Sequence, residues 1–304
     1  CMKILLIAGG WSSEREVSLN GARGMAEALR ALGHSVTFFD LLTEFDQLLP
    51  QAREHDFALI NLHGAPGEDG LVQAMLDRVG CPYQGAGPAG SFLALNKAAA
   101  KQLFRHAGLP TADWEFLPCP PPADWQPRLP YPLFVKSNTG GSSLRLGRAR
   151  DRAELDKVLA EIFAAGDEAL IEPELKGREV TCGILGEEAL PPILIEPVAG
   201  DFFDYESKYA TGGAREICPA PIAPELTDRV RELALAAHRA LGLRGYSRAD
   251  FILDADQNLT LLEVNTLPGM TSTSLVPQEA KVIGLDFGQL LERLMELGMA
   301  RRKS

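Results

Sequence analysis

The chain has 304 residues, of which 46% are hydrophobic and 23% charged, as in ordinary globular domains. This composition excludes disordered and collagen-like proteins, and the length predicts two domains or three small ones. Forty-one acidic residues against 30 basic ones give a formal net charge of −11. Because such a surface repels polyphosphate backbones, we expect no nucleic-acid partner.

The five cysteines are scattered and form no Cys-x-x-Cys pair: Cys1, Cys81, Cys119, Cys182 and Cys218. Their odd number and spacing argue against a disulfide framework or a structural zinc site and favour a reducing compartment. No stretch approaches the roughly 20 apolar residues of a membrane helix, and the first apolar run, residues 4–8, is too short for a signal peptide. We therefore expect a cytoplasmic protein with no membrane partner.

Aliphatic strands and amphipathic helices alternate over the first third of the chain. Buried strands are predicted at residues 4–8, 36–39 and 57–62. Helices are predicted over residues 19–32 and 71–78, and Gly33 ends the first of them. Alternation of this kind is typical of a parallel α/β domain.

The segment from Gly85 to Gly90 matches G-x-G-x-x-G formally. A dinucleotide-binding turn would follow a clear strand and precede an acidic residue about 20 positions on, and both are missing. We therefore interpret the segment as a linker between domains. A helix over residues 91–106 is expected after it.

Seven prolines between residues 118 and 132 exclude an interior strand or helix and indicate a surface connection. The elements expected after it, which suggest an α+β domain, are a strand at 133–136, a polar loop at 137–143, a helix over 152–165 and strands at 169–172, 179–185 and 190–195. The last third is expected to contain a helix over 225–241, a β-hairpin and a closing helix over 287–297.

The hairpin, residues 248–254 and 259–265, is the most informative segment. Pairing Asp254 with Leu259 places Asp250 opposite Glu263 and Arg248 opposite Asn265. Because side chains alternate along a strand, these last four share one face. The other face is expected to carry the apolar residues Phe251, Leu253, Leu262 and Val264.

Two carboxylates and an amide oxygen at close quarters form the oxygen-only site that Mg²⁺ prefers when it also holds phosphate. Without a cation, the opposed carboxylates would repel each other. The alternative is a solvated face that merely alternates polar and apolar residues. Arg248 beside them suits anionic charge that develops during phosphoryl or acyl transfer.

Two lysines could face the same phosphates. Lys136 ends the strand before the polar loop, and Lys97 lies within the expected helix after the linker. Loops of small hydrogen-bonding residues can bind phosphate through backbone N–H groups. The alternative for each lysine is a surface position, which is commoner. The chain has no G-x-x-x-x-G-K-[ST], which excludes a P-loop ATPase.

Acidic residues also mark two further candidate regions. Glu172 and Glu179, near an apolar strand end at Leu175, could hold a ribose and line an adenine slot, or could simply be solvated. Glu14 and His63 follow predicted parallel strands, whose carboxyl ends bind ligands in α/β sheets. Glu14 could equally be a first-turn residue that the helix dipole favours.

Five motifs, in this order along the chain, resemble those of D-alanine–D-alanine ligases of the ATP-grasp superfamily. They are Gly9-Gly10-x-Ser12-x-Glu14-Arg15-Glu16-Val17-Ser18, Leu62-His63-Gly64 with Gly67-Glu68-Asp69-Gly70, residues 204–209, Cys218-Pro219-Ala220, and residues 263–271. The resemblance extends from about residue 3 to residue 297. It implies a three-domain ATP-grasp architecture, with an N-terminal parallel α/β domain (1–90) followed by two α+β domains (91–184 and 185–304) that hold ATP.

The resemblance also implies a reaction and its residues. ATP would phosphorylate one D-alanine, and the amine of a second would attack the acyl phosphate. Contacts to ATP are implied for Lys97, Lys136, Ser143, Glu172, Leu175, Glu179 and Lys208. Two Mg²⁺ or Mn²⁺ ions would be held by Asp250, Glu263 and Asn265. Contacts to the D-alanines are implied for Glu14, His63, Lys208, Tyr209, Arg248, Gly269, Ser274 and Leu275, and catalytic roles for Glu14, Ser142, Tyr209, Arg248 and the N–H of Gly269.

The sequence departs from the family pattern at Ser137, at Leu144-Arg145 and at Pro173-Glu174, which lie in the phosphate loop and the adenine hinge. Three alternatives stand beside the main interpretation: a D-alanine–D-lactate or D-alanine–D-serine ligase, a carboxylate–amine ligase of another pathway, and an inactive nucleotide sensor. Tyr209 favours an amine acceptor, and a homodimer is expected.

Overall fold

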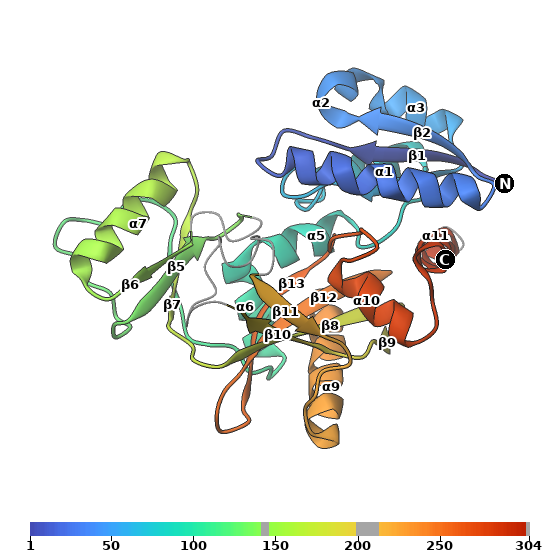
Figure 1. The fold of residues 1–304 in the computed structure, drawn as a ribbon. Coiled ribbons are helices and arrows are strands. Elements are labelled where there is room, and N and C mark those ends of the chain that lie inside the picture. Colours follow the sequence, from blue (N-terminus) through green and yellow to red (C-terminus); the bar gives the residue numbers. More distant parts are fainter. Residues whose placement is uncertain (141–145, 199–212, 302–304) are drawn as a thin grey trace.

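The computed structural model describes residues 1–140, 146–198 and 213–301. Within them the strands form three sheets, in the orders β2-β1-β3, β4-β7-β5-β6 and β11-β10-β8-β12-β13, with β9 paired to β8. In Figure 1 the first sheet lies at the upper right, the second lies with α7 at the left, and the third lies between and below them. None of the described helices is long and apolar enough to cross a bilayer.

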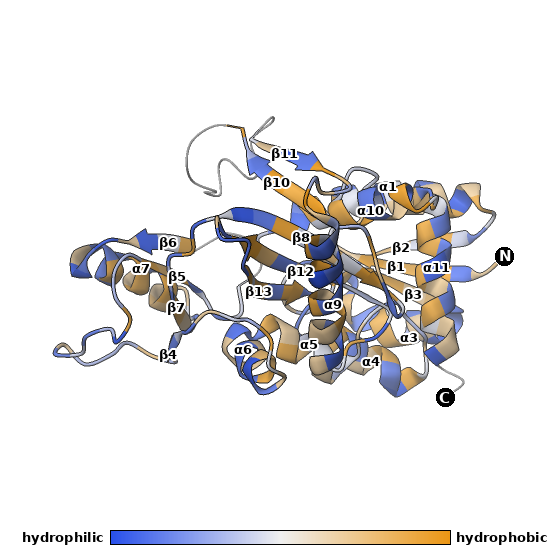
Figure 2. Ribbon diagram, turned by 90° about the horizontal axis from the view of Figure 1, so that it is seen from below, coloured by the Kyte–Doolittle hydropathy of each residue, from blue (hydrophilic) through white to orange (hydrophobic). Residues whose placement is uncertain are grey.

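The first sheet is parallel, as the alternating pattern predicts. Its central strand β1 (Lys3–Ala8) lies between β2 (Ser35–Asp40) and β3 (Phe57–Asn61). Figure 2 shows β1 mostly in the hydrophobic colour, and residues 4–8 are fully buried. The helices of this part are α1 (Arg15–Ala31), α2 (Leu41–Glu44), α3 (Leu48–Glu54) and α4 (Leu71–Val79), with a 3₁₀ turn at Phe45–Gln47.

The prediction of a single helix over residues 91–106 is wrong, because two helices occupy this region. α5 (Pro88–Leu95) ends and α6 (Lys97–His106) begins at Asn96, whose backbone is extended. The Asn96 side chain accepts the Ala99 N–H at 3.0 Å, which is an N-cap that satisfies an otherwise unpaired donor. Lys97 is therefore the first residue of α6 and not a mid-helix residue.

The second sheet consists of β4 (Glu115–Leu117), β5 (Leu133–Ser137), β6 (Leu146–Ala149) and β7 (Ala169–Pro173), with α7 (Arg152–Ala164) packed against it. All neighbouring pairs are antiparallel. The proline-rich residues 118–132 contain no helix or strand, as expected. β4 and β6 are too short to show a sequence period, and they were not anticipated.

The third sheet contains β8 (Arg178–Leu185), β9 (Glu188–Ala189), β10 (Ile193–Pro197), β11 (Ala214–Ile217), β12 (Tyr246–Leu253) and β13 (Leu259–Asn265). The strand expected at 190–195 begins only at Ile193, because Pro191 and Pro192 have no N–H to donate to a ladder. Residues of α6 and α9 (Pro224–Ala240) share a core with this sheet, and α10 (Leu275–Val282) and α11 (Phe287–Ala300) share one with the first sheet. The expected boundary near residue 184 falls at the end of β8, whose neighbours are β10 and β12, and the three-domain division stays a prediction.

The hairpin register is confirmed at the end that carries the candidate metal ligands. Arg248 lies opposite Asn265 and Asp250 opposite Glu263. The pairing of Asp254 with Leu259 is wrong, because the register shifts by one between Asp250 and Phe251 and pairs Leu253 with Leu259. This β-bulge puts an extra residue into β13, so that Leu261 rather than Leu262 is fully buried in the core.

Replacing Asn96 with alanine tests the break between α5 and α6. Asn96 also accepts from Asn138 Nδ2 at 3.0 Å, so its loss removes a helix cap and a link to the loop after β5. We expect Asn96→Ala to lower the free energy of unfolding by about 1–2 kcal/mol in urea titrations. Asp151→Ala removes the matching N-cap of α7 and is the control, with an expected loss of about 1 kcal/mol. Equal stability of Asn96→Ala and the native chain would contradict the assigned cap.

Candidate active site

The polar face of the hairpin is held by a hydrogen-bonded network around Asp250. The Arg248 guanidinium donates to both Asp250 oxygens, at 2.9 and 3.1 Å, and the Thr181 hydroxyl donates to Oδ1 at 2.7 Å. Asp250 is only 3% exposed, and Glu263 faces it from β13. Burial opposes the charge on Arg248, but the carboxylates of Asp250 and Glu263 raise the pKa of its guanidinium above the usual value. Arg248 therefore remains a cation at any pH at which the protein functions.

The same face carries a suitable donor set for a divalent cation. Asp250, Glu263 and Asn265 supply carboxylate and amide oxygens, the ligands that Mg²⁺ prefers. Among the described residues no group of three His, Cys, Asp or Glu side chains could hold a metal by itself. Such an ion would therefore take its remaining ligands from phosphate oxygens and water, as Mg²⁺ commonly does.

The β-bulge brings Leu262 onto this polar face, which the sequence did not suggest. Leu261 and Val264 are buried on the core side, whereas Leu262 and Glu263 between them are both half-buried on the other. An apolar side chain beside two carboxylates provides a wall for a flat apolar group. A β-bulge leaves no clear sequence signal, so strict alternation assigned Leu262 to the core.

Lys97 joins α6 to the loop after β5. Its ammonium donates to the Gly140 carbonyl at 2.8 Å and lies 3.8 Å from a Glu263 oxygen. Burial lowers the pKa of Lys97, and the Glu263 carboxylate partly offsets that effect. The alternative interpretation of Lys97 as a surface residue is thus wrong, because its ammonium points into the candidate site.

Lys136 forms an ion pair of 2.7 Å with Glu172 across neighbouring strands β5 and β7. Burial opposes the charge of both groups, yet the pKa of Glu172 is lowered and that of Lys136 raised, because each stabilises the other. Lys101, which was not anticipated, contacts the second Glu172 oxygen at 3.0 Å. Its position one helical turn after Lys97 is the signal that could have found it.

Leu175 and Glu179 follow Glu172 at the transition from β7 to β8 and are half-buried. Two of the departures from the family pattern, Ser137 and Glu174, have local partners here, whereas Leu144 and Arg145 lie outside the described residues. The Ser137 hydroxyl accepts the Gly140 N–H at 3.0 Å, and Glu174 pairs with Arg148 at 3.0 Å. Ser137 therefore helps to order the loop after β5, and Glu174 helps to order the segment between β7 and β8.

The carboxyl edge of the first sheet carries Glu14, His63 and a buried carboxyl at Glu68. Glu14 stands at the N-cap position of α1, where the helix dipole favours a carboxylate even though the side chain makes no capping hydrogen bond, so the helix-dipole alternative stands beside a ligand role. Burial lowers the pKa of His63 to about 4, which leaves the ring neutral at physiological pH.

Glu68 was overlooked as a site residue, although it belongs to a motif that the sequence singled out. Its carboxylate accepts the Gly64 N–H at 2.5 Å. Burial raises the pKa of Glu68 to about 7, and the charges of Glu14 and Glu263 add to that increase while Lys97 opposes it. These interactions place the edge of the first sheet beside the hairpin face.

Gly269 and Ser274 lie between β13 and α10. Ser274 precedes Leu275, the first residue of α10, and its hydroxyl accepts the Thr271 N–H at 3.0 Å. A Cβ on Gly269 would lie only 3.1 Å from Ser274 Oγ, so glycine here leaves the Ser274 hydroxyl undisplaced. A helix N-terminus of this kind favours a carboxylate. The four expected residues Ser142, Ser143, Lys208 and Tyr209 lie outside the described residues.

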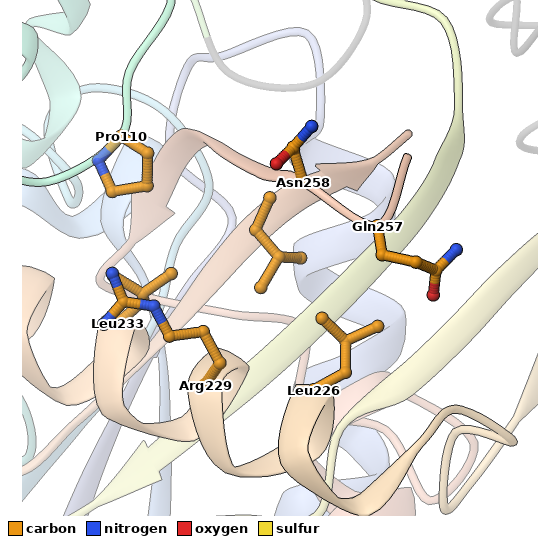
Figure 3. A pocket seen from close by; sticks show the side chains of 7 residues that line it. Pro110, Leu226, Arg229, Leu233, Gln257 and Asn258 are labelled. Atoms are coloured by element: carbon orange, nitrogen blue, oxygen red, sulfur yellow. The ribbon is translucent and has the colours of Figure 1, made fainter. Parts of the chain in front are cut away.

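A hollow of about 330 Å³ lies elsewhere, between the hairpin turn, α9 and the loop after α6 (Figure 3). It is lined by Pro110, Leu226, Arg229, Leu233, Gln257, Asn258 and Leu259, none of which is an expected site residue. The candidate site is therefore defined by its converging polar groups and not by this hollow.

Comparison with known proteins shows the family of the chain. The family model for the D-Ala–D-Ala ligase C-terminus matches residues 103–296. A D-alanine–D-alanine ligase of Desulfovibrio desulfuricans is 80% identical over 98% of both chains. The chain belongs to the D-alanine–D-alanine ligase family.

Solved structures support the fold that the sequence resemblance implies. A D-alanine–D-alanine ligase from Bacillus anthracis, complexed with ATP, is 34% identical, with a TM-score of 0.88 over 100% of this chain and 99% of that one. The VanG D-Ala:D-Ser ligase of Enterococcus faecalis is 28% identical, with a TM-score of 0.81 over 97% of this chain and 98% of that one. The expected ATP-grasp architecture is therefore confirmed.

The raised pKa of Glu68 predicts a measurable pH dependence of stability. In the folded chain Glu68 binds a proton up to about pH 7, whereas the unfolded carboxyl releases it above its ordinary value of 4.5. The stabilisation due to this group is therefore complete below the lower value and is lost as the pH rises through the higher one.

Glu68→Gln should remove this loss. Relative to the native chain, the variant should gain about 1–3 kcal/mol of unfolding free energy between about pH 5 and pH 7, measured in EDTA without nucleotide. Asp69→Asn, which removes a half-exposed carboxylate of the same loop, controls for the change in net charge. A constant difference between Glu68→Gln and the native chain across this range would refute the assignment.

Proposed function

We propose that the chain joins two D-alanine molecules into D-alanyl-D-alanine at the expense of ATP, through a D-alanyl phosphate. The observation that carries this proposal is the convergence of Lys97, Lys136 and the Asp250–Glu263 pair on one site, with Glu14 and Glu68 at its edge. That arrangement provides cations for a triphosphate and carboxylates for an amine in neighbouring positions. The relatives carry the same activity in their names.

The ATP-binding part of the site would be formed by the second and third sheets. Lys97 and Lys136 would contact phosphate oxygens, and Glu172, Leu175 and Glu179 would hold the adenosine. Leu262, half-buried beside Glu263, would add an apolar wall beside the base. The Bacillus anthracis relative was solved with ATP, which supports the use of the same nucleotide here.

Asp250, Glu263 and Asn265 would hold two Mg²⁺ or Mn²⁺ ions. Divalent cations bound there would neutralise charge on the transferring phosphoryl group. The paired carboxylates fit this role because they face each other across one ladder, where two like charges are unfavourable without a cation.

The remaining residues would act on the D-alanines. Glu14 would bind the ammonium of the first D-alanine, with His63 nearby as a neutral group. Arg248 and the Gly269 N–H would stabilise the oxyanion of the tetrahedral intermediate that forms when the second amine attacks. Ser274 and Leu275, at the N-terminus of α10, would receive the carboxylate of the second D-alanine. Ser143 and Lys208 are proposed for ATP, Lys208 also for that carboxylate, and Ser142 and Tyr209 for closing the site.

D-alanine is the acceptor that the comparisons favour. Relatives at 80% and 66% identity are named D-alanine–D-alanine ligases, whereas the D-Ala:D-Ser ligase is only 28% identical. The product serves peptidoglycan precursor synthesis. We further propose a homodimer, which rests on the family resemblance, and a cytoplasmic location, which fits the free cysteines and the use of ATP.

Removing the charge of Glu263 tests the metal assignment. Glu263→Gln should lower kcat by at least about 100-fold, because the cation loses a charged ligand. The free energy of unfolding should change by less than about 0.5 kcal/mol, since the side chain is partly exposed and not part of the core. The activity should recover only partly when Mg²⁺ is raised. A variant with near-normal turnover at ordinary Mg²⁺ would show that Glu263 is not a ligand.

Product analysis with competing acceptors tests the function itself. With ATP, Mg²⁺ and D-alanine, phosphate release should accompany D-alanyl-D-alanine formation, and L-alanine should not support it. Synthesis should rise from about pH 6 to about pH 9, because the attacking amine must be neutral. D-lactate and D-serine should be poor acceptors throughout.

Tyr209→Phe keeps the ring and removes one hydroxyl. We expect D-lactate incorporation to gain relative to D-alanine, most clearly at low pH, because the hydroxyl would no longer orient the amine. A native enzyme that makes mainly D-alanyl-D-lactate in mildly alkaline buffer would overturn the assignment of the acceptor.

A further inference from the structure

Lys101 is a fully buried cation that the proposed reaction does not use. It is 1% exposed and contacts Glu172 Oε2 at 3.0 Å and the Thr111 hydroxyl at 2.8 Å. Its ammonium also lies 5.3 Å from the centre of the Trp114 ring, within the range of a cation–π interaction. Its contacts are thus with other protein groups, and Glu172 is the one that reaches the proposed ATP site.

Glu172 stands between two lysines that come from different elements. Lys136 on β5 pairs with Oε1 at 2.7 Å, and Lys101 on α6 pairs with Oε2. The carboxylate is 2% exposed, and its one negative charge is shared by the fully buried ammonium of Lys101 and the partly buried one of Lys136. Around Glu172 itself, two ammonium groups stand against one carboxylate, which leaves a local excess of one positive charge. Such a local excess of positive charge suits an anionic ligand.

This local excess depends on Lys101. If Lys101 were neutral, the whole Glu172 charge would fall to Lys136, and the two would cancel each other. Lys136 would then have less charge to offer a phosphate, and Glu172 would be held at one oxygen only. A buried ion pair is itself weak evidence of a stabilising role, because desolvation offsets the attraction between the charges.

We propose that Lys101 is a positioning residue for ATP, which fixes Glu172 and leaves Lys136 free to attract the phosphates. The proposal rests on the assignment of Lys136 and Glu172 to the nucleotide made above. Lys101 itself is separated from the nucleotide by Glu172. Lys101 therefore affects the affinity for ATP and not the binding of D-alanine.

Steady-state kinetics of Lys101→Met tests the proposal. KM for ATP should rise about tenfold, while kcat and KM for D-alanine change less than about threefold. Lys101→Arg restores the charge and should return KM for ATP to within about threefold of the native value. Arg105→Met is the matched control: Arg105 stacks on the same Trp114 ring at 4.2 Å from the next turn of α6, but pairs with Asp113 and not with Glu172. It should leave KM for ATP unchanged.

A double-mutant cycle separates the charge effect from simple packing. In a Glu172→Gln background there is no negative charge for Lys101 and Lys136 to share, so Lys101→Met should change KM for ATP less than about twofold. If Lys101→Met alone is too unstable to purify, Lys101→Gln in the native and Glu172→Gln backgrounds completes the same cycle. An unchanged KM for ATP in Lys101→Met, or an equal penalty in both backgrounds, would overturn the proposal.

Lys136→Met distinguishes an error in the role of Lys101 from an error in the assignment of Lys136 to the nucleotide. If it raises KM for ATP while Lys101→Met does not, only the role of Lys101 is wrong. If Lys136→Met also leaves KM for ATP unchanged, the assignment of this lysine to the nucleotide is wrong, and the inference falls with it.

Discussion

Asp250 and Glu263 face each other directly across two neighbouring strands, and the rest of the candidate site is arranged around that pair. Like charges so close are unfavourable unless cations compensate them. The protein supplies Arg248 to Asp250, which Thr181 also holds, and Lys97 at 3.8 Å from Glu263. A divalent cation held by the pair would add to this compensation and bring phosphate oxygens with it.

Each sheet contributes one part of this charge balance. The third sheet supplies the carboxylates and Arg248, the second supplies Lys136 and Glu172, and the first supplies Glu14 and Glu68 at its carboxyl edge. α6 connects them, because Lys97 and Lys101 are one turn apart and reach Glu263 and Glu172 respectively. A nucleotide bound between the sheets with its divalent cations would complete the balance of charge between these lysines and carboxylates.

The sequence predicted those parts of the site that follow a regular period. Alternation along the hairpin placed Asp250 opposite Glu263 correctly, since the strands keep their register at that end. It failed beyond Asp250, because a β-bulge adds one residue without a distinctive composition, and so Leu262 was assigned to the wrong face. The break at Asn96 was missed because strong helix formers on both sides obscure a single capping residue. Lys101 and Glu68 look like ordinary surface residues until tertiary contacts bury them.

In the proposed site the opposed carboxylates hold divalent cations together with the nucleotide. Mn²⁺ in place of Mg²⁺ allows bound metal to be counted directly by electron paramagnetic resonance, with a non-hydrolysable ATP analogue present. We expect two Mn²⁺ ions per chain when the analogue is bound, weak binding without it, and loss of at least one ion in an Asp250→Asn, Asn265→Ala variant. The same number of tightly bound ions in that variant and in the native chain would contradict the account.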